Sequence, residues 1–488
     1  MVSGTIQGRR RGLVSLSRWK CFNSGTQNCA SQTIGKERLM NWRKLLSYLI
    51  VFTCIISPIA SNGQTVKKCE PNNDRALVLS GGGAKGAFEA GAIFHFINHR
   101  DCDFRDVAGV SVGALNATYI SEAPSDGNSL RNLQERSQGL VDFWRSINRP
   151  DDILRPRFLG SLRLLLGLVD SLYDFTPLQR IIEREVHPKK IRESRRSLRV
   201  GVVSFHDGVY QEFDPNDVQD DRVFRRYVLA STAIPVNAPL PRIPSSTTNS
   251  EIQYADGGVS HATPVVAYFS PCDFSRSDFS QKTLFGGRQF GLLPPCVAIG
   301  LQEHRGPIKE LFVVVANPYD PALTSSETGT VMSGGLEILE RTIDVLFTSS
   351  YRWDLNFALA ANRMLKWRED TYAWAKSIGA EGKAREVLGI TEETDLSRVE
   401  FPVKSANPGP DGFPLAYKMG VVAPLKVYAD SYGFDKANIR LQLYKGCIHA
   451  DLMMAQKFGM GSMRDACKRD FMKDVDEQQL KDDPDPPL

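Results

Sequence analysis

Short apolar runs alternate with segments of helical spacing in the first part of the chain. The run Arg75–Ser80 reads RALVLS and ends in glycines, which is typical of a buried strand, and Ala87–Asn98 behind it has helical spacing. A second apolar run, Asp106–Val110, is followed by a second helical segment, Val112–Tyr119. Strand, loop, helix, strand, turn and helix in this order predict a βαβ unit and a parallel sheet.

The same pattern predicts the remaining domain organisation. We expect an α/β catalytic domain over residues 72–320, with an insertion at 270–300 that is rich in Ser, Phe and Gly, and a helical C-terminal part over 321–472. The charged, Pro-rich tail, residues 473–488, is expected to be disordered. The predicted downstream strands are Leu198–Ser204, Val209–Phe213, Ile252–Ala255 and Leu311–Ala316, and the predicted helices are Pro177–Val186, Val223–Ala230, Gly335–Thr348 and Tyr351–Trp367.

Residues 1–63 differ from the rest in charge. They carry nine Lys and Arg against the single acid Glu37, which leaves 51 basic and 55 acidic residues in the remainder of a chain whose net charge is +4. A nucleic-acid-binding domain usually carries its basic excess on the folded part, so no nucleic-acid partner is expected.

A targeting signal is predicted near the start. Arg43 and Lys44 precede the apolar stretch Leu45–Ile56, and Pro58 and small residues follow it. The stretch is short for a spanning helix, which needs about 20 residues. We expect a basic, disordered extension at 1–39 and a signal peptide or anchor at 40–63, with Met1 and Met40 both open as the start. The protein would then be exported, as a periplasmic, secreted or membrane-associated chain.

Nine cysteines are present, six of them after the predicted leader. In an exported chain an even set permits three disulfides, and pairing of nearest neighbours would join 69 to 102, 272 to 296 and 447 to 467. Scattered buried thiols are an equal alternative. No metal site is expected, because the sequence shows no CxxC, no Cys/His cluster and no acidic run suited to Ca²⁺.

The first chemical motif is GGGAKG, with Gly81, Gly82, Gly83 and Gly86, placed between a predicted strand and a predicted helix. Such a loop presents backbone N–H groups at a helix N-terminus, and could bind a phosphate or stabilise an oxyanion. A dinucleotide site would require an acidic residue at the end of the second strand, where the sequence has Gly109, Val110 and Ser111 instead. The glycines alone leave both functions open.

The second motif is GVSVG, in which Gly109 and Gly113 flank Ser111. Its position between a strand and a helix is the context of a nucleophile elbow, in which the serine stands at the apex of a sharp turn. A serine that merely caps the helix is the alternative.

The third motif is DGG, in which Asp256 is followed by Gly257 and Gly258 at the end of a predicted strand. A nucleophilic serine needs a base, and none of the seven histidines stands beside a catalytic motif. A carboxylate at the carboxyl end of a strand lies where α/β sheets hold their chemistry, although a plain turn aspartate is the usual interpretation of an Asp-Gly pair.

Taken together, GGGAKG, GVSVG and DGG in this order resemble the patatin-like phospholipase family, in its exported, bacterial type. The stretches LYD at 172–174 and LASTAIP at 229–235 are similar to it as well. The resemblance implies a three-layer α/β/α fold with a mostly parallel central sheet and, without any cofactor, a Ser–Asp dyad. It implies Ser111 as the nucleophile and Asp256 as its base. The glycines Gly81, Gly82 and Gly83 would form the oxyanion hole, and Lys85 would stand at the family's basic position.

This resemblance favours a serine acyl hydrolase that cleaves lipid esters, of the phospholipase A or lysophospholipase type. A generic carboxylesterase or triacylglycerol lipase, a Ser–His triad using His261, His304 or His449, and an inactive lipid-binding scaffold are the alternatives. A lipid or phospholipid substrate and a membrane surface are the expected partners. The segment Arg155–Leu172 combines arginines with many leucines, which fits an interfacial helix, although a core-facing helix is the more usual role for such a pattern.

Overall fold

The structure is a computed structural model that describes residues 67–71, 74–244, 250–265, 268–269, 308–319, 335–387, 415–428 and 431–487. The predictions for the leader, residues 1–63, and for the insertion at 270–300 lie outside these residues. Among the described residues, no helix has both the length and the apolar character that a membrane crossing requires.

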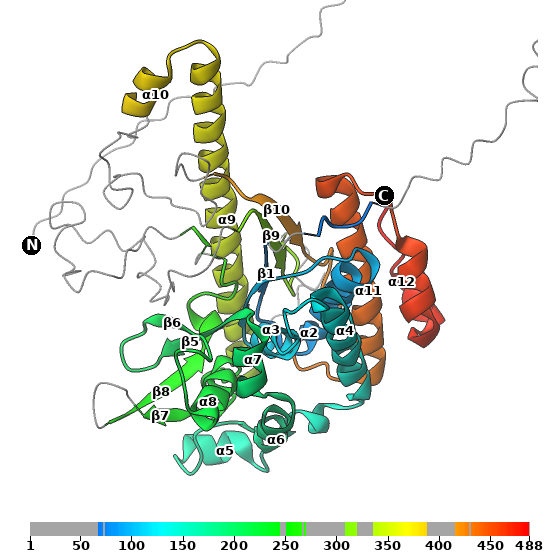
Figure 1. Ribbon diagram of the computed structural model, residues 1–488. Helices are drawn as coiled ribbons and strands as arrows, with labels where there is room; N and C mark the ends of the chain where they lie inside the picture. The colour runs from blue at the N-terminus through cyan, green and yellow to red at the C-terminus, as the bar shows by residue number, and fades with distance from the viewer. Residues whose placement is uncertain are drawn as a thin grey trace, which may run out of the picture. The chain divides into compact units, whose positions relative to one another are not determined.

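A mixed sheet forms the centre of the described chain (Figure 1). Its first five strands are parallel, and the last two pair antiparallel, as does β6 (Tyr210–Phe213) on the side of β5. Their order is β10 (Lys418–Val422), β9 (Glu310–Val314), β1 (Arg75–Leu79), β2 (Asp106–Val110), β5 (Ser197–Ser204), β8 (Glu251–Asp256) and β7 (Arg242–Pro244).

Helices cover both faces of the sheet (Figure 1). Leu77 and Leu79 of β1 point into a core shared with one set of helices, whereas Ala76 and Val78 point to the other face, where Tyr351 packs. This alternation is what a strand buried on both faces requires, and it confirms the three-layer α/β/α architecture. The first face carries α2 (Gly86–Phe94), α3 (Val112–Ser121), α4 (Ser129–Ser146), α8 (Asp221–Ser231), α11 (Lys436–Phe458) and α12 (Arg464–Phe471), and the second carries α9 (Gly335–Ser377).

The elements predicted from periodicity are present with small shifts at their ends. Two differences stand out. The helix after the glycine loop continues into a π-helical turn, η2 (His95–His99), and the two predicted helices within 335–367 are one helix, α9. Further helices are α6 (Thr176–Glu185), α7 (Pro188–Ser194) and α10 (Glu381–Val387).

The C-terminal part, expected from the sequence to be helical, also contributes a strand to the central sheet. Its strand β10 extends the catalytic sheet beside β9, and α11 packs along α2, directly behind the glycine loop. The expected disorder of the tail is also wrong for its described residues. Helix α13 (Glu477–Asp482) forms there, and Asp485 accepts hydrogen bonds from the buried Tyr444 and Lys445 side chains. These buried donors hold the tail in place.

The arginine- and leucine-rich segment Arg155–Leu172 does not form a helix that faces the core. It leaves the body between two short paired strands, β3 (Arg155–Pro156) and β4 (Tyr173–Asp174), and contains the short helix α5 (Gly160–Leu165). Six large apolar side chains of this excursion are exposed to solvent: Phe158, Leu159, Leu162, Leu165, Leu166 and Leu168. We call these six residues the α5 patch.

Two of the three possible nearest-neighbour disulfides are present among the described cysteines, Cys69–Cys102 and Cys447–Cys467. The expectation that the chain holds no Cys/His cluster is wrong, because His95 and His99 lie beside the second disulfide. The cluster escaped notice in the sequence because Cys447 is 352 positions from His95.

Candidate active site

Ser111 occupies a strained turn between β2 and α3. Its backbone has φ 57° and ψ −129°, a conformation that L-residues rarely adopt. Such backbone strain clusters at functional sites. The flanking glycines are required by close packing. A Cβ at Gly109 would lie 2.3 Å from the carbonyl oxygen of Gly113, and one at Gly113 would lie 2.5 Å from that of Ser80. The turn is therefore a nucleophile elbow in form.

Strand register brings Asp256 to Ser111. Val110, which precedes the serine, pairs with Gly201 of β5, and Asp256 pairs with the next residue, Val202. Because β8 runs antiparallel to β5, the two side chains reach the same level of the sheet from opposite directions. Asp256 does stand at the carboxyl end of its strand, as the sequence predicts, but that strand runs antiparallel to β5.

The Asp256 carboxyl group is fully buried, and burial raises its pKa to about 7 against the opposing effects of the Ser111 hydroxyl and the Gly258 N–H. The Gly258 N–H donates to Oδ1 at 2.8 Å, while Oδ2 has no hydrogen-bond partner of normal geometry within the described structure. The serine thus lies near enough to influence the carboxylate, but no well-formed hydrogen bond joins them here. A buried carboxyl with a free oxygen and a pKa near neutrality is suited to proton transfer.

One segment, LASTAIP at 229–235, positions both side chains. The Ser231 hydroxyl accepts the Ser111 N–H at 2.9 Å and donates to the Gly201 carbonyl at 2.7 Å. Two residues later, the carbonyl of Ala233 accepts the Asp256 N–H at 2.9 Å. In the sequence this stretch shows only a similarity to the family, and the positioning role of Ser231 was not predicted from it.

The glycine loop lies against the serine. A Cβ at Gly81 would stand 3.1 Å from that of Ser111, but the Gly81 N–H donates to the Ala262 carbonyl at 2.9 Å and so is occupied. Gly82 and Gly83 begin a short 3₁₀ helix, η1 (Gly83–Lys85), where N–H groups have no intrahelical acceptor. Of the three predicted oxyanion donors, Gly81 therefore has its N–H occupied in this structure, whereas the role of Gly82 and Gly83 stays a prediction.

The other motif residues hold this loop and the elbow in place. The Lys85 ammonium is buried and donates to Asn317 Oδ1 at 2.6 Å, and it also contacts the Ser431 hydroxyl. A Cβ at Gly86 would lie 2.2 Å from Val112, and one at Gly257 would lie 2.7 Å from the Gly201 carbonyl oxygen. Each position therefore serves packing or support.

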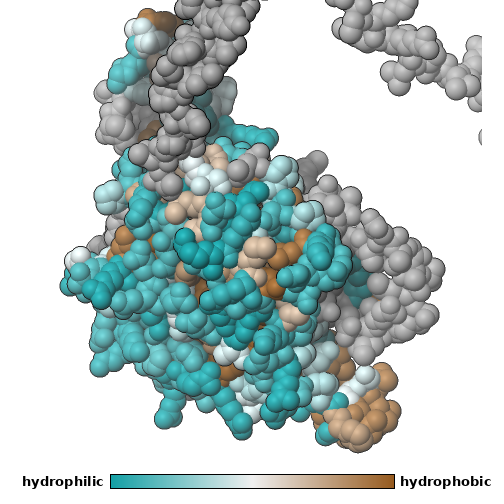
Figure 2. Space-filling view, turned by 90° about the vertical axis from the view of Figure 1, so that its right-hand side faces the viewer, coloured by the Kyte–Doolittle hydropathy of each residue, from teal (hydrophilic) through white to brown (hydrophobic). Residues whose placement is uncertain are grey.

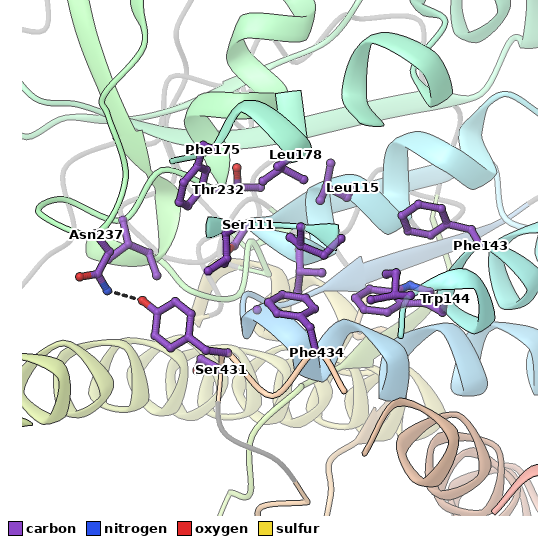
Figure 3. Close-up of a pocket in the computed structure, with 17 residues that line it drawn as sticks. Ser111, Leu115, Phe143, Trp144, Phe175, Leu178, Thr232, Asn237, Ser431 and Phe434 are labelled. Carbon is purple, nitrogen blue, oxygen red and sulfur yellow. Dashed lines mark hydrogen bonds between the residues drawn. The ribbon is translucent and has the colours of Figure 1, made fainter. Parts of the chain in front are cut away.

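A cavity opens at Ser111, with about 650 Å³ of empty space of which part is open solvent (Figure 3). Its polar groups, among them Thr232, Asn237, Ser431 and Tyr432, share the lining with a much larger apolar set, and the Asn237 amide donates to the Tyr432 hydroxyl across one wall. The apolar lining residues are Val112, Leu115, Phe143, Trp144, Ile147, Ile153, Leu154, Phe175, Leu178, Ile234 and Phe434. This pocket was not predicted from the sequence, because its walls come from six separate stretches of the chain.

The two candidate histidines that the structure describes are engaged elsewhere. His261 pairs with Asp354 of α9 at 2.7 Å, and His449 bonds the Tyr428 hydroxyl and the Ala423 carbonyl. Neither forms a hydrogen bond to Ser111 in the described structure. His304 lies outside the described residues. The arrangement gives no support to a Ser–His triad with His261 or His449.

Comparisons with known proteins agree with the motifs. The family model "Patatin-like phospholipase" matches residues 77–268, a range that contains Ser111 and Asp256. No curated protein matches the sequence.

Two solved structures are similar to the chain at low identity. VipD from Legionella pneumophila is 12% identical, with 80% of this chain and 73% of that chain covered and a TM-score of 0.24. The heterodimeric ExoU–SpcU complex from the type III secretion system of Pseudomonas aeruginosa is 14% identical, with 68% of each chain covered and a TM-score of 0.23. At such scores no conclusion is drawn from either. The family match and the α/β/α architecture together show that the chain contains a patatin-like phospholipase domain at residues 77–268.

Proposed function

We propose that this protein hydrolyses acyl esters of membrane lipids with Ser111 as nucleophile and Asp256 as general base. The observation that carries the proposal is the placement of the strained Ser111 beside a fully buried carboxyl group, at the mouth of an apolar cavity. The family match supports lipid hydrolysis as the reaction class.

The first chemical step is transfer of the Ser111 proton to Asp256. The serine oxygen attacks the ester carbonyl carbon, and a tetrahedral oxyanion forms. Asp256 then returns the proton to the leaving alcohol, and the acyl group stays on Ser111. Water deprotonated by the same carboxylate releases the fatty acid.

The oxyanion would be stabilised by backbone N–H groups. Gly82 and Gly83 offer theirs at the start of η1, and Val112 offers its own at the start of α3. Each such donor typically contributes about 3–4 kcal/mol to transition-state stabilisation.

The apolar lining of the cavity supports an acyl chain as its occupant. Aromatic and aliphatic side chains from α3, α4 and α6 enclose the space beyond Ser111, while the polar groups stay near the serine (Figure 3). This arrangement is expected of a site that buries a hydrocarbon chain and holds its ester group at one end.

The α5 patch supports a membrane surface as the place of action. Phe158 and Leu165 are 82% and 85% exposed, and hydrophobic side chains gather at the lower end of the molecule in Figure 2, the end at which α5 lies in Figure 1. The excursion leaves the body just after Leu154 and returns just before Phe175, and both of these residues line the cavity. A bilayer that receives the patch would therefore lie close to the cavity's walls.

Charge supports the same orientation. Arg155 precedes the patch, Arg163 lies within it, and both are exposed. They can therefore pair with anionic headgroups while the apolar side chains enter the acyl region. Export, expected from the leader, would place this surface against an outer or target membrane.

The test of the reaction is fatty-acid release by the full chain from phospholipid vesicles, triacylglycerol emulsions and short nitrophenyl esters. Ser111→Ala and Asp256→Asn are expected to abolish release, and a fluorophosphonate probe is expected to label Ser111 alone. His261→Ala and His449→Ala are the matched controls and should keep most activity. Full activity in Ser111→Ala would overturn the proposal, and turnover of short esters alone would reduce it to a generic carboxylesterase.

The test of the membrane surface is co-sedimentation with vesicles of phosphatidylcholine containing anionic lipid. Replacing Leu165 and Leu166 with serine should weaken binding on the order of tenfold or more, because each buried leucine side chain contributes about 2 kcal/mol. Turnover of a soluble short ester should not change. Equal vesicle binding by wild type and this double variant would refute the assignment.

A further inference from the structure

Four side chains with metal-binding atoms meet in the helical layer: His95, His99, Cys447 and Cys467. All four are buried, and their candidate ligand atoms lie within 4.8 Å of one another. They stand at the end of the helix that begins at the glycine loop, and the catalytic mechanism uses none of them.

Backbone geometry brings these residues together. The two histidines lie on the π-helical turn η2, a conformation found mostly at functional sites. Helix α11 approaches α2 so closely that a Cβ at Gly446 would lie 1.9 Å from the Phe88 carbonyl oxygen, and one at Gly91 would lie 2.0 Å from that of Leu443. This crossing sets Cys447 beside His95, and α12 supplies Cys467.

The distances match a tetrahedral zinc site. Zn–N bonds of 2.0–2.1 Å and Zn–S bonds of 2.3 Å at tetrahedral angles require N···N of about 3.3 Å and N···S of about 3.6 Å. The two Nδ1 atoms are 3.1 Å apart. Cys467 Sγ lies 3.5 Å from Nδ1 of His95, and Cys447 Sγ lies 3.7 Å and 3.8 Å from the Nδ1 atoms of His95 and His99.

Carboxylates stand behind both imidazoles, as in many metal centres. His99 Nε2 is 2.7 Å from Asp470 Oδ2, and His95 Nε2 is 3.6 Å from Asp451 Oδ1. Arg100 Nε also lies 3.2 Å from His95 Nε2, and its guanidinium pairs with Asp451 at 2.6 Å.

We propose that His95, His99, Cys447 and Cys467 bind one Zn²⁺ when the two cysteines are reduced, and that the metal-bound and disulfide forms are alternative states of one site. In this structure a disulfide joins the two sulfurs, so the S···S edge of the tetrahedron is a covalent bond. The other edges measured already have the lengths that zinc requires.

The exchange between the two states is balanced in electrons and protons. A dithiol reductant gives two electrons and two protons to the Cys447–Cys467 bond and is itself oxidised to a disulfide. Zinc then displaces both thiol protons. Any proton on the histidine Nδ1 atoms must also leave or move to Nε2. Asp470 can receive the N–H of His99 there, whereas His95 Nε2 accepts from Arg100 Nε in this structure, so that hydrogen bond must open if His95 takes its proton on Nε2. Oxidation by two electrons reforms the disulfide and releases the ion.

The experiment uses the full chain, reduced with a dithiol, incubated with ZnCl₂ and freed of unbound metal. We expect about one bound Zn²⁺ by elemental analysis, and Co²⁺ in its place should give the visible bands of a tetrahedral site with sulfur charge transfer. Replacing Cys447 and Cys467 with serine should remove both. The same change at Cys69 and Cys102, a disulfide-forming pair outside the cluster, should leave both intact.

Alkylation of the reduced wild type tests the site without any variant. Bound zinc should slow the modification of Cys447 and Cys467 at least tenfold and leave Cys69 and Cys102 unchanged, as read by mass spectrometry. A reduced protein that takes up no zinc, or that keeps it after loss of both cluster cysteines, would overturn the proposal.

Discussion

The Ser111–Asp256 site and the Cys/His cluster are both buried groups of polar atoms, yet they are built in opposite ways. In the first, a backbone strained at φ 57° stands beside a carboxyl oxygen without a hydrogen-bond partner. In the second, the histidines bond each other and an aspartate, and the sulfurs are joined. The strain and the unpaired oxygen of the first site lower the stability of the fold but leave the serine and the carboxylate free to react. The hydrogen bonds and the disulfide of the second site raise the stability of the fold. Mutations at the two sites should therefore move activity and stability in different directions.

The largest effect on activity is expected from Ser111→Gly. Loss of the nucleophile should lower kcat/KM on the order of 10⁴-fold or more. Glycine adopts positive φ without strain, so the variant should be more stable than Ser111→Ala by about 1 kcal/mol. Urea unfolding of both variants, beside ester turnover, measures the two effects, and equal stability would contradict the assigned strain.

The second largest effect on activity is expected from Asp256→Asn, a loss of about 10³-fold or more. Its effect on stability depends on pH. The folded-state pKa of about 7 is raised above the usual 3.8, so the unfolded state loses its proton first and the native form loses stability between about pH 4 and pH 7. Above pH 7 the variant should be more stable, by at most about 4 kcal/mol. Unfolding at pH 4 and pH 8 checks this, and a variant less stable at pH 8 would refute it.

Gly83→Ala should lower activity by about 10²-fold although the nucleophile Ser111 is still present. The residue has φ 59°, and an added Cβ would lie 2.1 Å from the Ser431 carbonyl oxygen, so the oxyanion loop must shift. Gly127→Ala, where an added Cβ meets no atom within 4 Å, is the matched control. A loss confined to KM would argue against an oxyanion role.

A smaller and graded effect is expected from pH alone. Because the base must be ionised, kcat/KM of the wild type should rise about tenfold per unit below pH 7 and level off above it. The pH dependence of turnover with a neutral, soluble ester measures this. A profile that is flat between pH 5 and pH 8 would show that Asp256 is not the base.

The smallest effect on activity is expected at the cluster. Replacing Cys447 and Cys467 with serine opens a loop of 20 residues, which should lower the free energy of unfolding of the oxidised protein by about 3 kcal/mol. The value of kcat at 25 °C should stay within about twofold of the wild type. A loss of activity comparable to that of Asp256→Asn would break the contrast between the two sites.

The local chemistry and the first elements of the fold followed from the sequence. The strands Arg75–Leu79 and Asp106–Val110 are buried because, after their charged first residues, they are apolar on both faces, and Gly109 and Gly113 mark a turn in which only glycine fits. Periodicity and steric limits act between neighbours in the chain, so a single sequence reveals them.

Contacts between distant segments were decided only by the tertiary structure. The antiparallel course of β8 sets Asp256 at the level of Ser111, β10 joins the catalytic sheet, and the cavity and the Cys/His cluster gather side chains from both ends of the described chain. The exposure of the α5 patch was also hidden, because leucines at helical spacing have the same pattern whether they face a core or the solvent. Periodicity gives the apolar face of a segment, but what covers that face depends on how the whole chain packs.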